Sequence, residues 1–401
     1  MWNISKETKR EFTTCNLLPI YESDDEWEIA LREAQDDGED LISRLKEELE
    51  EVKEELLPIL PSRFVPYLED GTLNQPTLPK IVREDYIQWV SVATKKFEQI
   101  LDAAYERKKQ ALPFLSPAVQ DVFEDSLHDS VIQRIERCKD TLHLYVNTDG
   151  GFSSKAIIHF IFKGFTSEET DVPLEVGQWF IYDELQKTDG GFAYRVLFEC
   201  PESQWTITMK DIEAVYFYRP KEFKRLRDEE KLEGMSITEY IAMLNLDHDY
   251  WLITPHLEIP IQSFAGESII IENGSIQFEQ NEMVVTLENE RFSYDISEHN
   301  PIEFLYTNVE EDPYAYLHET LSFDDMESAL SSEDPALQAQ AWNTMYANPI
   351  ELADIINRVL SKIEITDENE MMLSVLAEHF YKNGILIKEV KEKYASFIME
   401  D

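Results

Sequence analysis

Basic residues are scarce in this chain. Its 401 residues include 36 Lys and Arg against 81 Asp and Glu, a formal net charge of −45. Such a charge repels phosphate, so nucleic acid and anionic membrane surfaces are poor partners, whereas a basic protein or a cation is favoured. Acidity of this kind also serves solubility alone. The net charge therefore favours a basic protein or a cation as a partner, but it does not show that the chain has a binding partner.

Cysteines and long apolar runs are also few. Cys15, Cys138 and Cys200 show no C-x-x-C spacing, so we expect no disulfide framework, and a reducing cytosol fits best. The start MWNISKETKREF lacks the apolar core of a signal peptide. No uncharged apolar run reaches the roughly 18 residues that a membrane span needs. We therefore expect a cytoplasmic protein with no leader and no membrane contact.

The common signatures of catalysis are missing as well. The sequence contains no Walker loop, no Rossmann glycine set, no G-x-S-x-G and no H-E-x-x-H. Acidic pairs are too abundant to single out a general acid and base. We expect no cofactor, and the balance leans away from an enzyme.

Helical spacing dominates the first 120 residues. One helical pattern begins after Ser23, a predicted N-cap, and ends at Pro58 and Pro61. A second, long helix is predicted over 80–111 and a short one over 116–126.

From about residue 127 the apolar period changes to two, which predicts strands. The pentapeptide Thr-Asp-Gly-Gly-Phe occurs at 148–152 and again at 188–192, each time between two alternating segments. Its glycines supply the positive φ of a tight turn, so the repeat predicts two hairpins in one antiparallel sheet, with Phe152 restarting the apolar pattern. A phosphate-binding loop would instead require a helix after the glycines.

The second half of the chain repeats this change of period. Residues 267–296 alternate around Asn-Gly and similar turns, which predicts an antiparallel meander. Further helices are predicted to start at Asp334–Pro335 and Asn348–Pro349. The predicted fold is α+β, with N-terminal helices over 1–120, an antiparallel β domain over 121–220, a linker and β-meander over 221–310, and a C-terminal helical bundle over 311–401.

The sharpest chemical motif places Ser126, His128 and Asp129 within four residues. On an extended strand neighbouring side chains point to opposite faces, so His128 and Asp129 do not both address Ser126 easily. The favoured interpretation is a turn held by side-chain to backbone hydrogen bonds. The alternative is a metal-dependent hydrolase, which would need further ligands such as His143 and His159 to converge on His128 and Asp129.

A second short motif, Asp247-His248-Asp249, also offers oxygen and nitrogen ligands to a divalent cation. It lacks the glycine and the terminal glutamate of an EF-hand loop. A turn is the favoured interpretation here too.

Two acidic stretches are candidate contact surfaces for a basic protein. The helix predicted over 36–55 is rich in Glu, and residues 292–357 hold fourteen Asp or Glu and no Lys or Arg. Attraction across such faces speeds association and makes it sensitive to salt. The predicted protein-binding residues are Glu310, Glu311, Asp312, Asp324 and Asp325.

Four segments together carry a family resemblance: MWNISKETKREF at the start, LEDGTLN at 68–74, SLHDSVI at 126–132 before a Gly-Gly-Phe hairpin, and FECPESQWTITMKDIE at 198–213. Over about its first 220 residues the chain resembles an uncharacterised bacterial family, domain-of-unknown-function family 4085. This resemblance implies no activity.

The Leu-His-Asp entry to the first strand is also similar to small immunity proteins of bacterial toxin systems. By association, that similarity implies a non-enzymatic antagonist of a basic toxin or nuclease.

Overall fold

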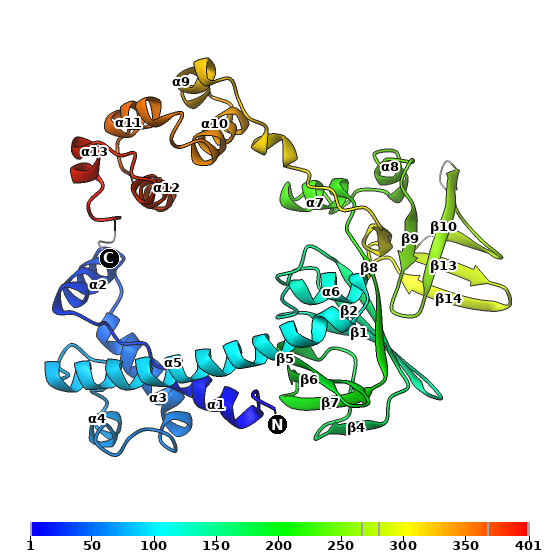
Figure 1. Cartoon of the computed structure of the whole chain (residues 1–401), viewed down its shortest axis with the longest axis horizontal. Coiled ribbons are helices and arrows are strands. Elements are labelled where there is room, and N and C mark those ends of the chain that lie inside the picture. The colour runs from blue at the N-terminus through cyan, green and yellow to red at the C-terminus, as the bar shows by residue number, and fades with distance from the viewer. Residues whose placement is uncertain (1, 266–267, 280, 367–368, 399–401) are drawn as a thin grey trace. The chain divides into compact units, whose positions relative to one another are not determined.

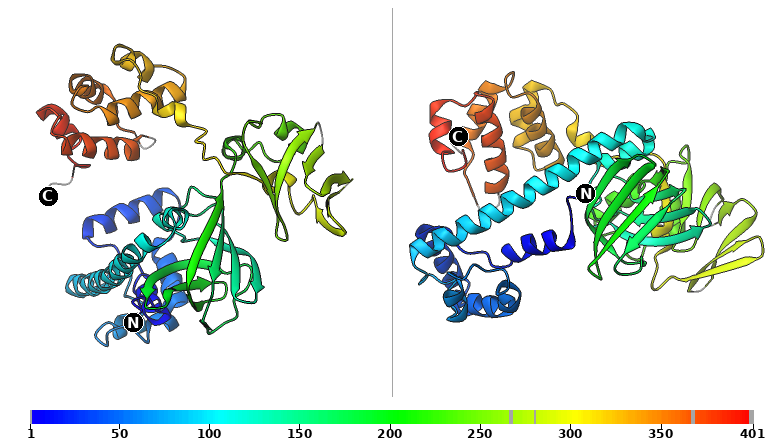
Figure 2. Two further views of the ribbon diagram at one scale, coloured as in Figure 1. Left: turned by 45° about the vertical axis from the view of Figure 1, so that its right-hand side comes forward. Right: turned by 60° about the horizontal axis from the view of Figure 1, so that its bottom comes forward.

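The computed structural model describes residues 2–265, 268–279, 281–366 and 369–398. It shows an α+β protein, as predicted (Figures 1 and 2). Contacts between Cα atoms divide the chain into two compact units. The first consists of Met1–Arg219 and Asn245–Glu310, and the second of Pro220–Leu244 and Glu311–Asp401.

Six α-helices precede the first strand, and α5 has the predicted bounds. The hydroxyl of Ser23 accepts the Glu26 N–H and caps α2, as predicted. The aromatic rings of Phe97 on α5 and Tyr182 on β5 lie 5.4 Å apart, so α5 reaches from the N-terminal helices to the sheet (Figure 2). The helices are α1 (Lys6–Cys15), α2 (Asp24–Asp36), α3 (Leu41–Leu56), α4 (Val65–Glu69), α5 (Lys80–Ala111) and α6 (Pro117–Glu124).

The start of the helix predicted over 36–55 is wrong, because the helical backbone is interrupted between the end of α2 at Asp36 and the start of α3 at Leu41. Gly38 takes a φ of +74° after α2 ends, a conformation that glycine adopts without a Cβ penalty. Asp40 then caps α3 by accepting the Ser43 N–H. Leu41, Leu45, Leu49 and Leu56 of α3 are buried.

An eight-stranded antiparallel sheet follows, with the order β4-β7-β6-β5-β1-β2-β3-β8. Phe162 of β3 lies 6.1 Å from Tyr194 of β6 and 5.8 Å from Trp205 of β7, measured between ring centroids. Three strands separate β3 from β6 in the sheet, so the sheet must curl to enclose these rings (Figure 1). The strands are β1 (Val131–Cys138), β2 (Thr141–Asn147), β3 (Ile157–Lys163), β4 (Ser167–Thr170), β5 (Trp179–Thr188), β6 (Gly191–Glu199), β7 (Ser203–Met209) and β8 (Asp211–Phe217).

Both Thr-Asp-Gly-Gly-Phe copies connect the strands of a hairpin, as predicted, but the two connections differ. The second copy is a two-residue turn, because Thr188 pairs with Gly191. The first is a longer loop between β2 and β3, and Phe152 does not restart the strand. Phe152 is 69% exposed and β3 begins only at Ile157.

Residues 245–310 form the predicted meander and add strands that the sequence did not predict. β9 (Tyr250–Ile253), β10 (Glu258–Ala265), β11 (Ser268–Ile271) and β15 (Leu305–Thr307) make a four-stranded sheet, and β12 (Gly274–Glu279), β13 (Glu282–Leu287) and β14 (Glu290–Asp295) make a three-stranded one. Arg219 joins this region to the first hairpin loop. Its Nε donates to Asp149 at 2.7 Å and its Nη1 donates to the Glu303 carbonyl at 2.6 Å.

The second unit is helical. Asp334 caps α10 by accepting the Ala336 N–H, as predicted. The helix start predicted at Asn348–Pro349 is wrong, since α11 begins at Ala353. The helices are α7 (Lys221–Asp228), α8 (Ile237–Ile241), α9 (Met326–Leu330), α10 (Pro335–Ala347), α11 (Ala353–Lys362), α12 (Glu370–Lys382) and α13 (Lys388–Lys393). Within the described residues, no helix of either unit is long and apolar enough to cross a membrane.

Candidate functional site

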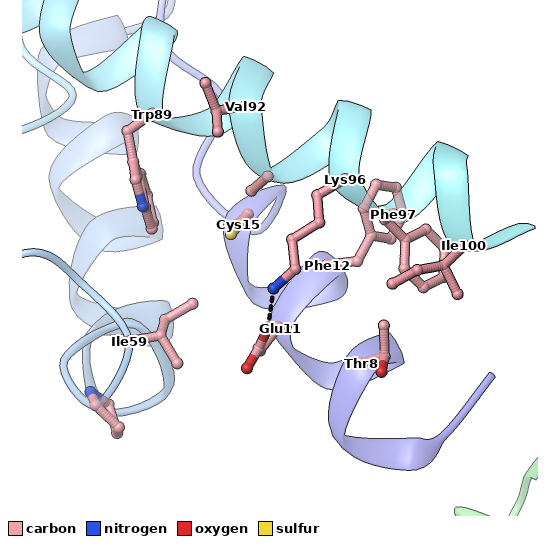
Figure 3. A pocket seen from close by; sticks show the side chains of 12 residues that line it. Thr8, Glu11, Phe12, Cys15, Ile59, Trp89, Val92, Lys96, Phe97 and Ile100 are labelled. Carbon is pink, nitrogen blue, oxygen red and sulfur yellow. Dashed lines mark ion pairs between the residues drawn. The ribbon is translucent and has the colours of Figure 1, made fainter. Parts of the chain in front are cut away.

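A pocket of about 430 Å³ opens between α1, α5 and the turn that follows α3 (Figure 3). This volume falls in the range of small-molecule sites, about 300–1,000 Å³. Phe12 of α1 stacks on Phe97 of α5, with ring centroids 4.3 Å apart, and so holds the two helices together at one end. Most of the wall is apolar and comes from Phe12, Ile59, Trp89, Val92, Phe97 and Ile100.

Three ionisable side chains line this pocket. Figure 3 shows Lys96 reaching from α5 toward Glu11 on α1, where Nζ and the carboxylate lie 3.8 Å apart. The two side chains are 70% and 63% exposed, so the pair contributes little to stability. Cys15 is buried, and burial, followed by the nearby Glu11 carboxylate, raises the pKa of its thiol. The thiol is therefore protonated at neutral pH and acts as an apolar group.

His128 borders a smaller hollow of about 180 Å³, together with Ser126, Tyr182 and the ion pair of Lys108 with Asp183. The backbone N–H of His128 donates to the Ser126 hydroxyl at 3.2 Å, so Ser126 holds the local turn. Asp129 has a φ of +64° and precedes β1, and the Ser130 N–H donates to the Leu127 carbonyl at 3.1 Å, which agrees with the favoured interpretation of a turn. The chain reverses at Asp129.

His128 and Asp129 contact each other directly, with Nδ1 and Oδ1 3.1 Å apart. The rings of Phe152 and Tyr182 lie 5.8 and 6.0 Å from the His128 ring. Among the residues that the structure describes, no group of three or more His, Cys, Asp or Glu side chains is placed to hold a metal ion. The arrangement does not favour the metal-dependent hydrolase.

His143 and His159 meet each other on the sheet. His143 Nδ1 lies 2.9 Å from His159 Nε2, and His159 Nδ1 lies 3.1 Å from the Glu258 carboxylate of β10. The Tyr145 ring stacks on the His159 ring, with centroids 3.9 Å apart. The Arg134 guanidinium lies over the same Tyr145 ring, 3.5 Å from its centroid. These side chains form the polar cluster, which joins β1, β2 and β3 to β10.

Three members of the polar cluster, His143, Glu258 and Tyr145, have shifted pKa values. Burial, and then the neighbouring His159, lowers the pKa of His143. Burial acts to raise the pKa of Glu258, but the hydrogen bond and charge of His159, with the charge of Arg134, outweigh it and leave that pKa lowered. Burial raises the pKa of Tyr145 strongly.

Asp247, His248 and Asp249 lie in a turn before β9. Asn245 organises it, because its Oδ1 accepts the Asp247 N–H at 3.2 Å and its amide nitrogen lies 2.9 Å from His248 Nε2. The Asp249 carbonyl accepts the Thr307 hydroxyl. These contacts agree with the interpretation of this motif as a turn.

The predicted protein-binding residues differ in their surroundings. Glu311 accepts from Lys221 Nζ at 2.9 Å, and the Asp312 carboxylate accepts the Tyr314 N–H at 2.8 Å. Asp324 and Asp325 are exposed in a short 3-10 turn, Phe323–Asp325. Glu310 is the last residue of the first unit, whereas the other four predicted protein-binding residues belong to the second.

The N-terminal segment carries an arrangement that sequence reasoning missed. Glu184 of β5 is fully buried, and its carboxylate accepts the Asn3 and Ile4 N–H groups at 2.8 and 3.0 Å. The Asn3 side chain and Arg107 donate to the same carboxylate. We name these residues the N-terminal clamp. The only sequence signal was the Trp-Asn-Ile start itself, which supported the family resemblance and no role for Glu184.

Comparison with protein-family models gives a match over the first half of the chain. A family model described as "Protein of unknown function (DUF4085)" matches residues 3–209, just over half of the chain. The chain belongs to this family. The DUF4085 match spans the N-terminal clamp, the pocket of Figure 3 and strands β1–β7. A search of curated proteins and a search of solved structures each gave no match.

Proposed function

We propose that this chain is a cytoplasmic bacterial binding protein without enzymatic activity, and that a basic protein docks on the acidic face of α2 and α3. The three cysteines are free, which agrees with a reducing compartment. Residues 22–55 contain sixteen Asp or Glu and four Lys or Arg. This region therefore has a strongly negative charge.

The outward face of α3 is the observation that carries the proposal. Glu47, Glu51, Glu54 and Glu55 are exposed, and the described structure gives none of them an ion pair. Glu47, Glu51 and Glu55 follow one another at i, i+4, where like charges destabilise a helix. A cationic partner would remove this repulsion on binding, and opposite charges would steer its approach.

The residues predicted near 310–325 provide a second proposed surface. Glu311 is already paired with Lys221, so Asp312, Asp324 and Asp325 would carry this surface in the second unit. We propose Glu310 as a further contact, independent of those three.

The test begins with capture of a basic protein from source lysate at about 50 mM salt, where the Debye length of about 14 Å leaves surface charges weakly screened. The captured protein should be released at high salt. Affinity is then measured with the purified partner by calorimetry. A variant with Gln at Glu47, Glu51, Glu54 and Glu55 should bind about ten-fold more weakly at low salt. Loss of that difference at high salt would support an electrostatic origin.

Two variants separate the proposed surfaces. Asn at Asp312, Asp324 and Asp325 tests the second surface, with the α3 face unchanged. If the α3 variant binds as the wild type does, the α3 proposal is wrong. If no basic protein is retained at near-equal stoichiometry, the binding function itself fails.

A further inference from the structure

We propose that the pocket between α1 and α5 binds a small amphipathic cation, an organic ammonium group on an apolar body. This site is separate from the acidic face of α3 and does not depend on the proposed partner. The residues that would hold the ligand all lie in the first unit and within the family match.

The walls fit the apolar body of such a ligand. Trp89 and Ile59 flank the space in Figure 3, and the neutral Cys15 thiol lies between α1 and α5. A volume of about 430 Å³ holds a ring with a short alkyl chain. Transfer of this apolar surface from water is favourable at about 25 cal/mol per Å².

The charge of the ligand follows from Glu11. Among the described residues that line the pocket, Glu11 carries the only carboxylate, and its one described ion pair is the long, exposed contact with Lys96. An ammonium group entering the pocket can take the place of Lys96 beside Glu11, because the Lys96 side chain is free to turn toward water. The net charge of −45 and the aromatic wall both favour a cation over an anion.

The other cations of α1 do not change this balance. Lys6 pairs with Asp171, Lys9 with Glu199 and Arg10 with Glu202. These three carboxylates neutralise the basic residues of α1 that do not line the pocket. Lys96 is thus the single cation that competes for Glu11 within the described pocket.

Three matched probes test the ligand class: 4-phenylbutylamine, 4-phenylbutan-1-ol and 4-phenylbutanoate. They share one apolar body and carry a cationic, a neutral and an anionic head group. Calorimetric titration of the full chain should show saturable 1:1 binding, tightest for the amine. Replacement Glu11→Gln should weaken amine binding about three- to five-fold and leave the alcohol unchanged.

Two tryptophan variants on α5 locate the site. Ala93→Trp fills the pocket and should abolish binding of all three probes. Gln99→Trp adds the same ring at an exposed position that does not line the pocket, and should bind as the wild type does. Matching circular dichroism melts of the two variants would show that both fold.

Three outcomes would overturn the proposal. Absence of saturable binding by the amine removes the site. Equal binding by Ala93→Trp places the ligand elsewhere. Tighter binding of 4-phenylbutanoate than of the amine assigns the pocket to anions, with Lys96 as the counter-ion. None of these results bears on the acidic face of α3, which is tested with a protein partner.

Discussion

The imidazole of His159 lies between a carboxylate and a second imidazole. Its Nδ1 is 3.1 Å from Glu258 and its Nε2 is 2.9 Å from His143 Nδ1. Two facing imidazole nitrogens share one hydrogen, so one ring must accept where the other donates. Protonation of both rings would place two hydrogens and two positive charges in this contact. The lowered pKa of His143 favours its neutral form, which avoids two facing positive charges in this contact.

The first prediction is a loss of stability in acid. Both His143 and Glu258 have lowered pKa values in the folded chain, so the unfolded chain binds more protons. The His143 contribution is complete above about pH 6.5 and declines as the pH falls through its folded pKa. The Glu258 contribution is lost at lower pH, below about 4.5. The free energy of unfolding, measured by urea titration at pH 8, 6, 5 and 4, reports both the His143 and the Glu258 contributions.

Replacement of His143 identifies the source of this dependence. His143→Gln should reduce the decline in unfolding free energy between pH 7 and 5, because the titrating group is gone. His318→Gln, at an exposed position in the other unit, should leave the profile unchanged. An unaltered pH profile in His143→Gln would contradict the assignment.

The second prediction concerns the N-terminal clamp. Glu184→Gln replaces a buried acceptor of four hydrogen bonds by an amide whose NH₂ faces donors. We expect a loss of about 3 kcal/mol in unfolding free energy, because the amide nitrogen cannot accept a hydrogen bond and leaves buried N–H donors of the clamp unsatisfied. Hydrogen exchange should rise at Asn3 and Ile4. The exposed pair of Glu213 with Lys163 gives a control, since Glu213→Gln should change little; equal losses would refute the clamp.

The third prediction concerns the turn between β5 and β6. Gly191 has a φ of +140°, and a Cβ there would lie 2.2 Å from the Met209 carbonyl oxygen. Gly191→Ala should therefore cost more than about 2 kcal/mol, since backbone must move. Gly190 has open space around its Cβ position and no positive φ, so Gly190→Ala should cost far less. Thermal melts compare the two, and similar melting temperatures would count against this geometry.

The fourth prediction concerns the thiols. Cys138 and Cys200 are exposed, whereas Cys15 is buried with a raised pKa. A maleimide should modify two thiols per chain rapidly and the third only slowly, because the thiolate reacts and Cys15 is neither accessible nor ionised. Mass spectrometry of labelled peptides identifies the sites. Rapid modification of Cys15 in the native chain would contradict the burial of this thiol.

Local rules predicted much of the fold. The apolar spacing over 80–111 gave α5 its bounds, and the alternation around the two Gly-Gly turns gave the hairpins β2–β3 and β5–β6. The Ser23 and Asp334 caps are equally local signals. Where the same rules were wrong, tertiary contacts decided. Phe152 lies beside His128 outside the strand, and the Asn348–Pro349 pair does not start a helix.

The candidate sites depended on contacts far apart in sequence. Glu258 meets His159 across 99 residues, and Glu184 meets Asn3 across 181. No spacing rule relates such positions, so the polar cluster and the N-terminal clamp were not predictable. The metal-site alternative required His143 and His159 to join His128 in one site. They pair with each other because β2 and β3 are adjacent, while His128 belongs to the turn before β1.

The division of the chain into two units has a consequence for dissecting it. The second unit is assembled from residues 220–244 and 311–401, with 245–310 returning to the first. The backbone therefore passes from one unit to the other three times, and no single truncation yields either unit whole. Ending the chain at residue 310 leaves α7 without the Glu311 partner of Lys221. To isolate the DUF4085-containing unit, a short linker must replace residues 220–244 and the chain must end at residue 310. A single protease cut after residue 310 does not separate the units, because residues 220–244 of the first fragment still pack in one unit with residues 311–401.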